Sequence, residues 1–575
     1  MRRLVADPPA AFASINGAAI SDLEVTKASY KAGAPIVSGT AARVPVTEHL
    51  TIPGFGVWTV HTTLHLVERS GRWLVQWTPE TIDPSLRPAS QFALTATWPP
   101  RAPILGAGNV ALTAEEETVT VGIEGKYVKD PSSLSAALVA AGATSAEASA
   151  ALATAKVKPA YFEPVFTVSW ARYLQLKPTL YPLPGTVFQT SEAREAVTPG
   201  LEAHLVGSVG PITAQELHAL GAPYDTTSVV GQTGLEQYDQ AQLAGTPGTT
   251  ISVVSDDGST LATLASKKPV PGTPVRTSIN PTVQRAAEAA LAHEDKPAAL
   301  VAVDASTGQL LASVSDPSSD AFDQAFDGTF PPGSTFKTIT STALIEHGLS
   351  PSSSASCPTT ITVGGELFHN AEGDAPVQNM AQAFTESCNT AFIGLTTKNL
   401  DPANLPAAAA EYDVGTSPDI GLTVFGGSVP TPTSAAGLAA TAIGQGSVLV
   451  SPLDMAMVAA AIDSGVVREP RLVLGAPDDR APTHRLPTDV VDDLHVMMAD
   501  VVASGTAANQ GLPSGTYAKT GTAEYGSGNP LPTDAWLIGF RGNVAFAVLV
   551  VDGGYGGPTD GPIAASFLNA LGTSG

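Results

Sequence analysis

The sequence is poor in cysteine, in basic residues and in long apolar runs. Two cysteines in 575 residues exclude a small domain held together by disulfides. Lysine and arginine number 29 against 53 aspartates and glutamates, and the net charge of −24 argues against nucleic acid or an anionic membrane surface as a partner. The longest apolar runs, 455–462 and 544–551, are far shorter than the roughly 18 residues of a membrane-crossing helix. Prolines near the start also interrupt the apolar stretch of a signal peptide, so either the protein is cytosolic or its export and anchoring segments have been removed.

Motifs of several common chemistries are absent too. The sequence has no Walker loop, no GxGxxG after a strand and no GxSxG elbow. Its histidines include no HExxH or other metal-binding spacing, so lone residues such as His204, His218 and His369 are expected to be structural. The sequence therefore predicts no metal site and no cofactor.

The length predicts about three or four domains. Residues 1–100 are expected to form a small β-rich unit, because apolar residues alternate on both sides of a turn at 69–71. Residues 101–270 combine short strands with an Ala-rich helical stretch over 132–155, capped by Ser132 or Ser133, and suggest an elongated non-catalytic region. Residues 271–575 predict an α+β domain, with a hairpin over 298–314, a strand over 544–551, and helices over 334–347, 452–464 and about 562–571. The glycine-rich segment 553–557 is expected to be a turn.

The segment 331–340, PPGSTFKTIT, carries the first candidate site residues. Two prolines and a glycine immediately precede Ser334 and cannot continue a helix. A helix is therefore expected to begin at Ser334, with Phe336 and Ile339 on a buried stripe. Ser334 and Lys337 are then neighbours on the first turn, where a neutral lysine can take the proton of the serine. The alternative is a capping serine beside a solvated lysine. Among all the lysines, however, only Lys337 follows a serine at this spacing.

Two later motifs support a site. Ser387 and Asn389 supply a hydroxyl and an amide, which can pass a proton to a leaving nitrogen and hold a substrate carbonyl. Lys519 supplies a second cation, whose repulsion favours the neutral form of Lys337. The three residues after Lys519 are expected on the same strand: Thr520 and Thr522 can bind a terminal carboxylate, and Gly521 lets a substrate strand approach the backbone.

In order and spacing, these three motifs resemble those of class B penicillin-binding proteins, the D,D-transpeptidases of peptidoglycan synthesis. Further segments are similar to the same family: GQTGLE at 231–236 resembles its dimerisation region, TSIN at 277–280 the entry to its transpeptidase domain, and IGQG at 443–446 a family segment before a helix. The hairpin ending in WLVQWTPETIDPSL is similar to the nuclear-transport-factor-like cone domain of the methicillin-resistance subgroup.

The resemblance implies a multidomain α+β protein. A cone-shaped domain over 1–100 and a dimerisation-like pedestal over 101–270 would precede a transpeptidase domain over 271–575, built as an antiparallel sheet with helices like the serine β-lactamases. It also implies a mechanism. Ser334 attacks the carbonyl between the two D-alanines of a stem peptide, backbone N–H groups of Ser334 and Thr522 form the oxyanion hole, and an amine resolves the acyl-enzyme.

The implied partners are stem peptides ending in D-Ala-D-Ala, β-lactams that trap Ser334, and a cell-wall glycosyltransferase. The implied location is the extracytoplasmic face of the bacterial cell membrane, with the native anchor missing from this chain. A D,D-carboxypeptidase or endopeptidase remains the alternative enzyme, and a β-lactam sensor or scaffold the alternative from another class. Cys357 and Cys388 are either two buried thiols or, in an exported protein, a disulfide that pins the second motif.

Overall fold

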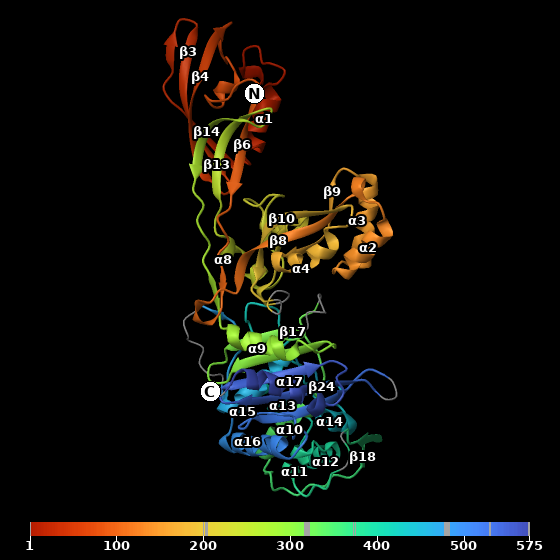
Figure 1. Ribbon diagram of the computed structural model, residues 1–575. Coiled ribbons are helices and arrows are strands. Elements are labelled where there is room, and N and C mark those ends of the chain that lie inside the picture. Colours follow the sequence, from red (N-terminus) through yellow and green to blue (C-terminus); the bar gives the residue numbers. More distant parts are fainter. Residues whose placement is uncertain are drawn as a thin grey trace. The chain divides into compact units, whose positions relative to one another are not determined.

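The computed structural model describes residues 2–198, 201, 205–315, 322–371, 373, 375–475, 484–527 and 531–572, so His204 lies outside the described residues. The chain forms two units, and Figure 1 labels many of their helices and strands. The first unit comprises 1–103, 209–232 and 239–275, and the second comprises 104–208, 233–238 and 276–575. The first unit is therefore discontinuous in sequence.

In the first unit, two antiparallel sheets pack around one apolar core, and β11 and β12 form a further two-stranded sheet. In the larger sheet the strands run in the order β1-β3-β4-β5, with β2 beside β3. In the smaller sheet β13 lies between β14 and β6, so a hairpin from far along the chain completes the N-terminal unit. The elements are η1 (Arg2–Leu4), α1 (Phe12–Ser21), β1 (Lys27–Ala32), β2 (Ile36–Ser38), β3 (Ala41–Ile52), β4 (Gly56–Arg69), β5 (Arg72–Val75), η2 (Pro79–Thr81), β6 (Ser90–Thr97), β11 (Val209–Pro211), α6 (Ala214–Leu220), β12 (Val229–Gly231), α8 (Gln240–Ala244), β13 (Gly248–Ser255) and β14 (Thr260–Lys267).

The second unit begins with a three-stranded sheet and its helices. The Ala-rich stretch predicted as one helix is two, because Gly142 adopts a positive φ of 123° between them. The first of these helices is capped by Asp130, whose side chain accepts from the N–H groups of Ser132 and Ser133, rather than by either serine. The elements are β7 (Ile104–Leu105), η3 (Ala107–Asn109), β8 (Thr113–Glu124), η4 (Gly125–Tyr127), α2 (Pro131–Ala140), α3 (Ser145–Val157), β9 (Phe162–Ser169), α4 (Trp170–Leu180), β10 (Thr186–Ala196) and α7 (Gly234–Tyr238).

A five-stranded antiparallel sheet in the order β17-β16-β25-β24-β23 organises the rest of the second unit. Helices pack against this sheet, so its central strands are buried along almost their whole length. The elements are β15 (Val275–Thr277), α9 (Pro281–Leu291), β16 (Ala298–Asp304), β17 (Leu310–Ser315), η6 (Gly333–Phe336), α10 (Lys337–Glu346), β18 (Thr360–Val363), β19 (Glu366–His369), α11 (Met380–Thr385), α12 (Asn389–Asn399), α13 (Asn404–Ala410), α14 (Ala435–Thr441), α15 (Pro452–Ser464), β20 (Val466–Val467), β21 (Val473–Leu474), β22 (His484–Arg485), α16 (Thr488–Ala503), β23 (Tyr517–Glu524), β24 (Thr533–Arg541), β25 (Val544–Val550) and α17 (Gly556–Ala570).

Three predicted helices of this region differ in how closely the structure follows them. α15 has the predicted bounds, with Gly465 in the left-handed conformation just after it. The helix expected from Ser334 begins as the 3-10 turn η6 and becomes α-helical at Lys337, and α10 is buried all round rather than on one stripe. α17 begins at Gly556, so part of the predicted glycine-rich turn is helical. The glycine lets the helix approach β23, since a Cβ on Gly556 would lie 2.3 Å from the carbonyl oxygen of Gly521.

Candidate active site

The turn that carries Ser334 is pressed against the edge strand β23. Gly333 has a positive φ of 51°, and a Cβ there would lie 2.7 Å from the carbonyl oxygen of Thr522. The indole N–H of Trp536 donates to the carbonyl oxygen of Pro331 at 3.0 Å and fixes the segment that precedes the turn. Ser334 is therefore placed by backbone contacts on both sides, beside the strand that carries the third motif.

Lys337 is fully buried beneath Ser334. Its Nζ lies 2.9 Å from Ser334 Oγ and 2.8 Å from Asn389 Oδ1, and it also bonds the carbonyl oxygen of Ser387. The ring of Phe392 lies 5.5 Å from the same nitrogen. A carbonyl oxygen and an amide oxygen can only accept, so each takes an N–H of Lys337. A neutral amine with both N–H groups so engaged turns its lone pair toward the Ser334 hydroxyl.

A second buried lysine, Lys519, contacts the same group of side chains. Lys519 donates from Nζ to Ser387 Oγ at 3.0 Å and to the carbonyl oxygen of Thr520 at 2.8 Å. Lys337 Nζ lies 3.5 Å from the same Ser387 Oγ, so the hydroxyl bridges the two lysines. Ser387 has a positive φ of 55°, which is uncommon for a residue with a side chain and turns its hydroxyl into the site. The structure thus brings Ser334, Lys337, Ser387, Asn389 and Lys519 together.

Two residues of the third motif do not lie as expected. Thr520 is fully buried, and its hydroxyl contacts that of Thr506 at 2.5 Å, so it faces away from the ligand side of β23. Gly521 faces the nucleophile turn, since a Cβ there would lie 2.9 Å from the carbonyl oxygen of Pro332. The role expected for Thr520 is wrong because its side chain points into the core. Gly521 makes room for the Ser334 turn, and its role toward a substrate strand stays a prediction.

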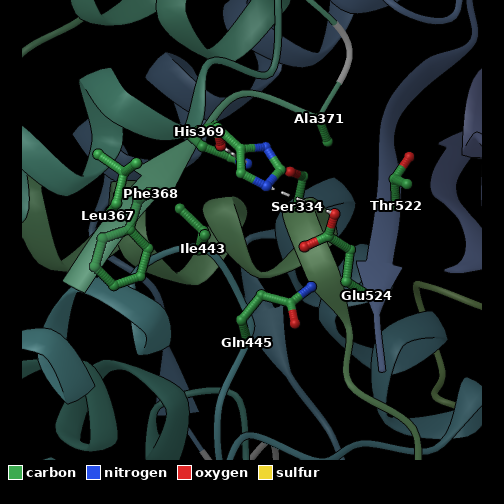
Figure 2. A pocket seen from close by; sticks show the side chains of 10 residues that line it. Ser334, Leu367, Phe368, His369, Ala371, Ile443, Gln445, Thr522 and Glu524 are labelled. Carbon is green, nitrogen blue, oxygen red and sulfur yellow. Dashed lines mark hydrogen bonds and ion pairs between the residues drawn. The ribbon is translucent and has the colours of Figure 1, made fainter. Parts of the chain in front are cut away.

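A cavity of about 150 Å³ opens at Ser334 (Figure 2). Thr522 and Asn389 line it, as the sequence suggested, but much of the wall comes from residues that sequence reasoning missed. His369, expected to be structural, lies on this wall with Nε2 4.0 Å from Glu524 Oε1. The hairpin of β18 and β19 brings these residues in, and no spacing in the sequence links it to the motifs. The other lining residues are Leu367, Phe368, Ala371, Ile443, Gln445 and Glu524.

The segment 443–446 closes the cavity from another side. The carbonyl oxygen of Gly444 accepts from the N–H of Gly333 at 3.0 Å, so this segment holds the nucleophile turn. The side-chain amide of Gln445 pairs with the backbone N–H and C=O of Glu524, at 2.9 Å each. The family resemblance pointed to this segment but assigned it no role. In the structure, its hydrogen bonds connect η6 to the C-terminal end of β23.

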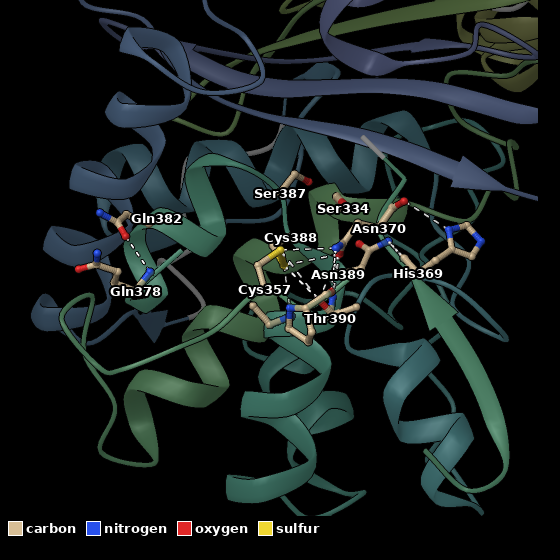
Figure 3. Close-up of a disulfide and its surroundings, with 12 residues drawn as sticks. Ser334, Cys357, His369, Asn370, Gln378, Gln382, Ser387, Cys388, Asn389 and Thr390 are labelled. Atoms are coloured by element: carbon tan, nitrogen blue, oxygen red, sulfur yellow. Dashed lines mark hydrogen bonds between the residues drawn. A yellow bond between two sulfur atoms is a disulfide. The ribbon is translucent and has the colours of Figure 1, made fainter. Parts of the chain in front are cut away.

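A disulfide joins Cys357 to Cys388 immediately beside Ser387 and Asn389 (Figure 3). Cys388 is the N-cap of α12, so the bridge anchors the start of the helix that carries Asn389. The side-chain amide of Asn389 donates to the carbonyl oxygen of His369 at 3.1 Å, and Thr390 Oγ1 donates to that of Pro358 at 2.6 Å. The second motif is thereby tied to both neighbouring segments.

Comparisons with known proteins agree with this geometry. The family model described as penicillin binding protein transpeptidase domain matches residues 298–569, and the penicillin-binding protein dimerisation domain matches 96–277. A peptidoglycan D,D-transpeptidase PbpA of Mycolicibacterium smegmatis is 34% identical over 49% of this chain and 67% of its own length. The PbpA of Mycobacterium tuberculosis is 32% identical over 52% of this chain and 72% of its own. The chain belongs to the class B penicillin-binding proteins.

A solved complex of penicillin-binding protein PBP2 and MreC from Helicobacter pylori contains a chain of the same fold, with a TM-score of 0.62 at 21% identity. The match covers 84% of this chain and 98% of that one. The predictions of a multidomain α+β fold with a C-terminal transpeptidase domain, and of a serine-type peptidoglycan D,D-transpeptidase, are thereby confirmed. Among the described residues, no helix combines the length and apolarity needed to cross a bilayer, and no cluster of His, Cys, Asp or Glu side chains suits a metal ion.

Proposed function

We propose that this transpeptidase uses Ser334 as its nucleophile and Lys337 as the base that activates it, and that its substrate is a peptidoglycan stem peptide ending in D-Ala-D-Ala. The observation that carries the proposal is the 2.9 Å separation of Ser334 Oγ and Lys337 Nζ in a site where Lys337 is fully buried. Burial disfavours the charged form of an amine, and a second buried cation disfavours it further. Both effects favour a lysine able to accept a proton.

The acylation step then moves one proton along a short path. Ser334 Oγ bonds to the carbonyl carbon while its proton passes to Lys337 Nζ, and the C–N bond to the terminal D-Ala breaks as that nitrogen gains a proton. Ser387 Oγ, 3.5 Å from Lys337 and 3.0 Å from Lys519, is suited to deliver that proton. The amine of a second stem then attacks the acyl carbon, releases Ser334 and forms the cross-link.

Substrate binding is proposed at the edge of β23. Backbone N–H groups of Ser334 and Thr522 would hold the oxyanion, and the contact between the nucleophile turn and Thr522 supports that assignment. Thr522 and Lys519 would attract the terminal carboxylate, and Asn389, on the cavity wall, would hold a substrate carbonyl. An extended peptide can pair with an edge strand through its backbone, and β23 is the last strand of its sheet among the described residues.

The nucleophile is tested by intact mass after incubation with benzylpenicillin. The parent chain is expected to gain one stable adduct and Ser334→Ala none. Ser341→Ala is the matched control, because Ser341 is buried on α10, its hydroxyl has no hydrogen-bond partner among the described residues, and it lies away from the cavity. Lys337→Met should slow adduct formation by about 10² to 10⁴-fold. An adduct that persists in Ser334→Ala would refute the proposal.

The reaction class is tested with a donor stem ending in D-Ala-D-Ala and an acceptor stem carrying a free amine. A transpeptidase releases D-Ala and yields a cross-linked dimer. A carboxypeptidase yields only the shortened stem, and a sensor or scaffold acylates with penicillin but turns over neither substrate. Each result thus identifies one of the functions that the sequence leaves open.

We infer an extracytoplasmic location, on the outer face of the cell membrane, from the disulfide, since such bonds persist mainly in oxidising compartments. A cell-wall glycosyltransferase is proposed as a partner because cross-linking acts on freshly polymerised strands. The assignments of a nuclear-transport-factor-like N-terminal domain and of the methicillin-resistance subgroup stay predictions, as does the division at residues 100 and 270. Support for the first comes from α1 and the long antiparallel sheet of the first unit.

A further inference from the structure

The first unit contains a cavity, open to solvent, that the transpeptidase chemistry does not use. Its volume is about 530 Å³, and its walls come from α1, from strands β1, β3, β4 and β6, and from the segments beside them. Phe12, Leu50, Trp58, Val60 and Leu64 line it, so the interior is largely apolar. Small-molecule sites commonly have volumes of roughly 300–1,000 Å³, and an engineered cavity of about 150 Å³ already holds benzene. The cavity therefore has the size and surface of a ligand site.

One carboxyl group interrupts this apolar wall. Glu48 lies on β3 two residues from both Val46 and Leu50, and all three line the cavity, so the alternation of the strand turns Glu48 inward. Its cross-strand neighbours are Tyr30 on β1 and Val60 on β4. Among the described residues, the Glu48 carboxyl forms neither a hydrogen bond nor an ion pair, whereas the backbone of Glu48 pairs with β1 and β4. This half-buried carboxyl therefore lacks the partner that an acid removed from water normally has.

The surroundings of Glu48 define what that partner would be. Burial and, to a lesser extent, the carboxyl of Asp83 together raise the pKa of Glu48 to about 7. The phenol of Tyr30 is the other titratable group of the wall, and burial, together with the carboxyl of Glu48, raises the pKa of that phenol. Two carboxyls repel an acidic ligand and attract a cation. The apolar walls of the cavity therefore favour a ligand with an apolar body, and the carboxyl of Glu48 favours a ligand with a basic group.

We propose that this cavity binds a small amphiphile whose alkyl or aryl body fills the apolar walls and whose protonated amine pairs with Glu48. Pairing supplies the hydrogen bonds that the carboxyl does not find within the protein, and the apolar body removes the facing side chains from water. The site is independent of Ser334, because every residue that lines it belongs to the first unit.

The test is calorimetric titration of the full chain at pH 8 with n-decylamine, n-decanol and decanoate, each below its micelle concentration. The amine is expected to bind saturably with one site per chain, and decanoate at least about tenfold more weakly. Glu48→Gln should weaken the amine at least about tenfold, a loss of about 1.4 kcal/mol, and leave n-decanol unchanged. The matched control is Glu68→Gln, an exposed glutamate on β4, which should alter neither.

Leu64→Trp places a larger side chain in the cavity and should abolish binding of all three probes. If that variant fails to fold, the comparison of Glu48→Gln with Glu68→Gln decides the question by itself. The proposal is overturned if n-decylamine does not bind saturably, if decanoate binds as tightly as the amine, or if Glu48→Gln keeps the parent affinity for the amine.

Discussion

Breaking the bridge between Cys357 and Cys388 is expected to weaken both the transpeptidase domain and its chemistry. The bond closes a loop of 31 residues, and the chain entropy of such a loop corresponds to about 3–4 kcal/mol of stability. The same bond holds the residue that caps α12, with Ser387 on one side and Asn389 on the other. Both neighbours contact Lys337, so a looser loop also displaces the partners of the proposed base.

The two effects are measured separately, in the presence and absence of dithiothreitol. Pulse proteolysis in urea gives the loss of unfolding free energy, expected at about 3–4 kcal/mol. The rate of labelling by a fluorescent penicillin gives the effect on the site. A displacement that costs the transition state only about 1.4 kcal/mol slows labelling tenfold, so we expect at least that factor.

The control is the double variant Cys357→Ala and Cys388→Ala. The sequence contains only these two cysteines, so the double variant should match the reduced parent and be insensitive to the reductant. Stability that changes by less than about 1 kcal/mol on reduction, together with an unchanged labelling rate, would refute the reasoning, because the bridge would then constrain neither the chain nor the site.

Three further changes test other contacts. Gly333→Ala places a Cβ 2.7 Å from the carbonyl oxygen of Thr522 at a positive φ, so penicillin labelling should fall at least about tenfold while the circular dichroism spectrum is kept. Arg194→Met removes the partner of Glu236, whose side chain is only 1% exposed, and should lower the unfolding free energy in urea by about 3–5 kcal/mol; adding Glu236→Leu should restore most of it. Burial raises the pKa of Asp454 from 3.8 to about 7, so the stability that its protonated form contributes is present below pH 4 and is lost as the pH rises through 7. Asp454→Asn should therefore lose less stability than the parent between pH 4 and 8 in calorimetric scans, and parallel pH profiles would contradict this.

Local sequence patterns predicted much of the fold and the central residues of the site. The alternation around residues 69–71 predicted the hairpin of β4 and β5, and the segment 452–464 with its terminal Gly465 predicted α15. Such features depend on neighbouring residues alone. The three motifs likewise predicted that a hydroxyl and two lysines would meet, because the chemistry of acyl transfer needs those groups together.

Tertiary contacts decided the rest. The direction of Thr520 depends on the packing of Thr506 beside β23, and the 3-10 turn at Ser334 depends on its contact with Thr522. His369 reaches the cavity only because a hairpin folds over it, and β13 completes the first unit by pairing with a strand from far earlier in the chain. Each of these joins segments distant in sequence, and no local pattern of charge, apolarity or spacing records which distant segment a side chain will meet.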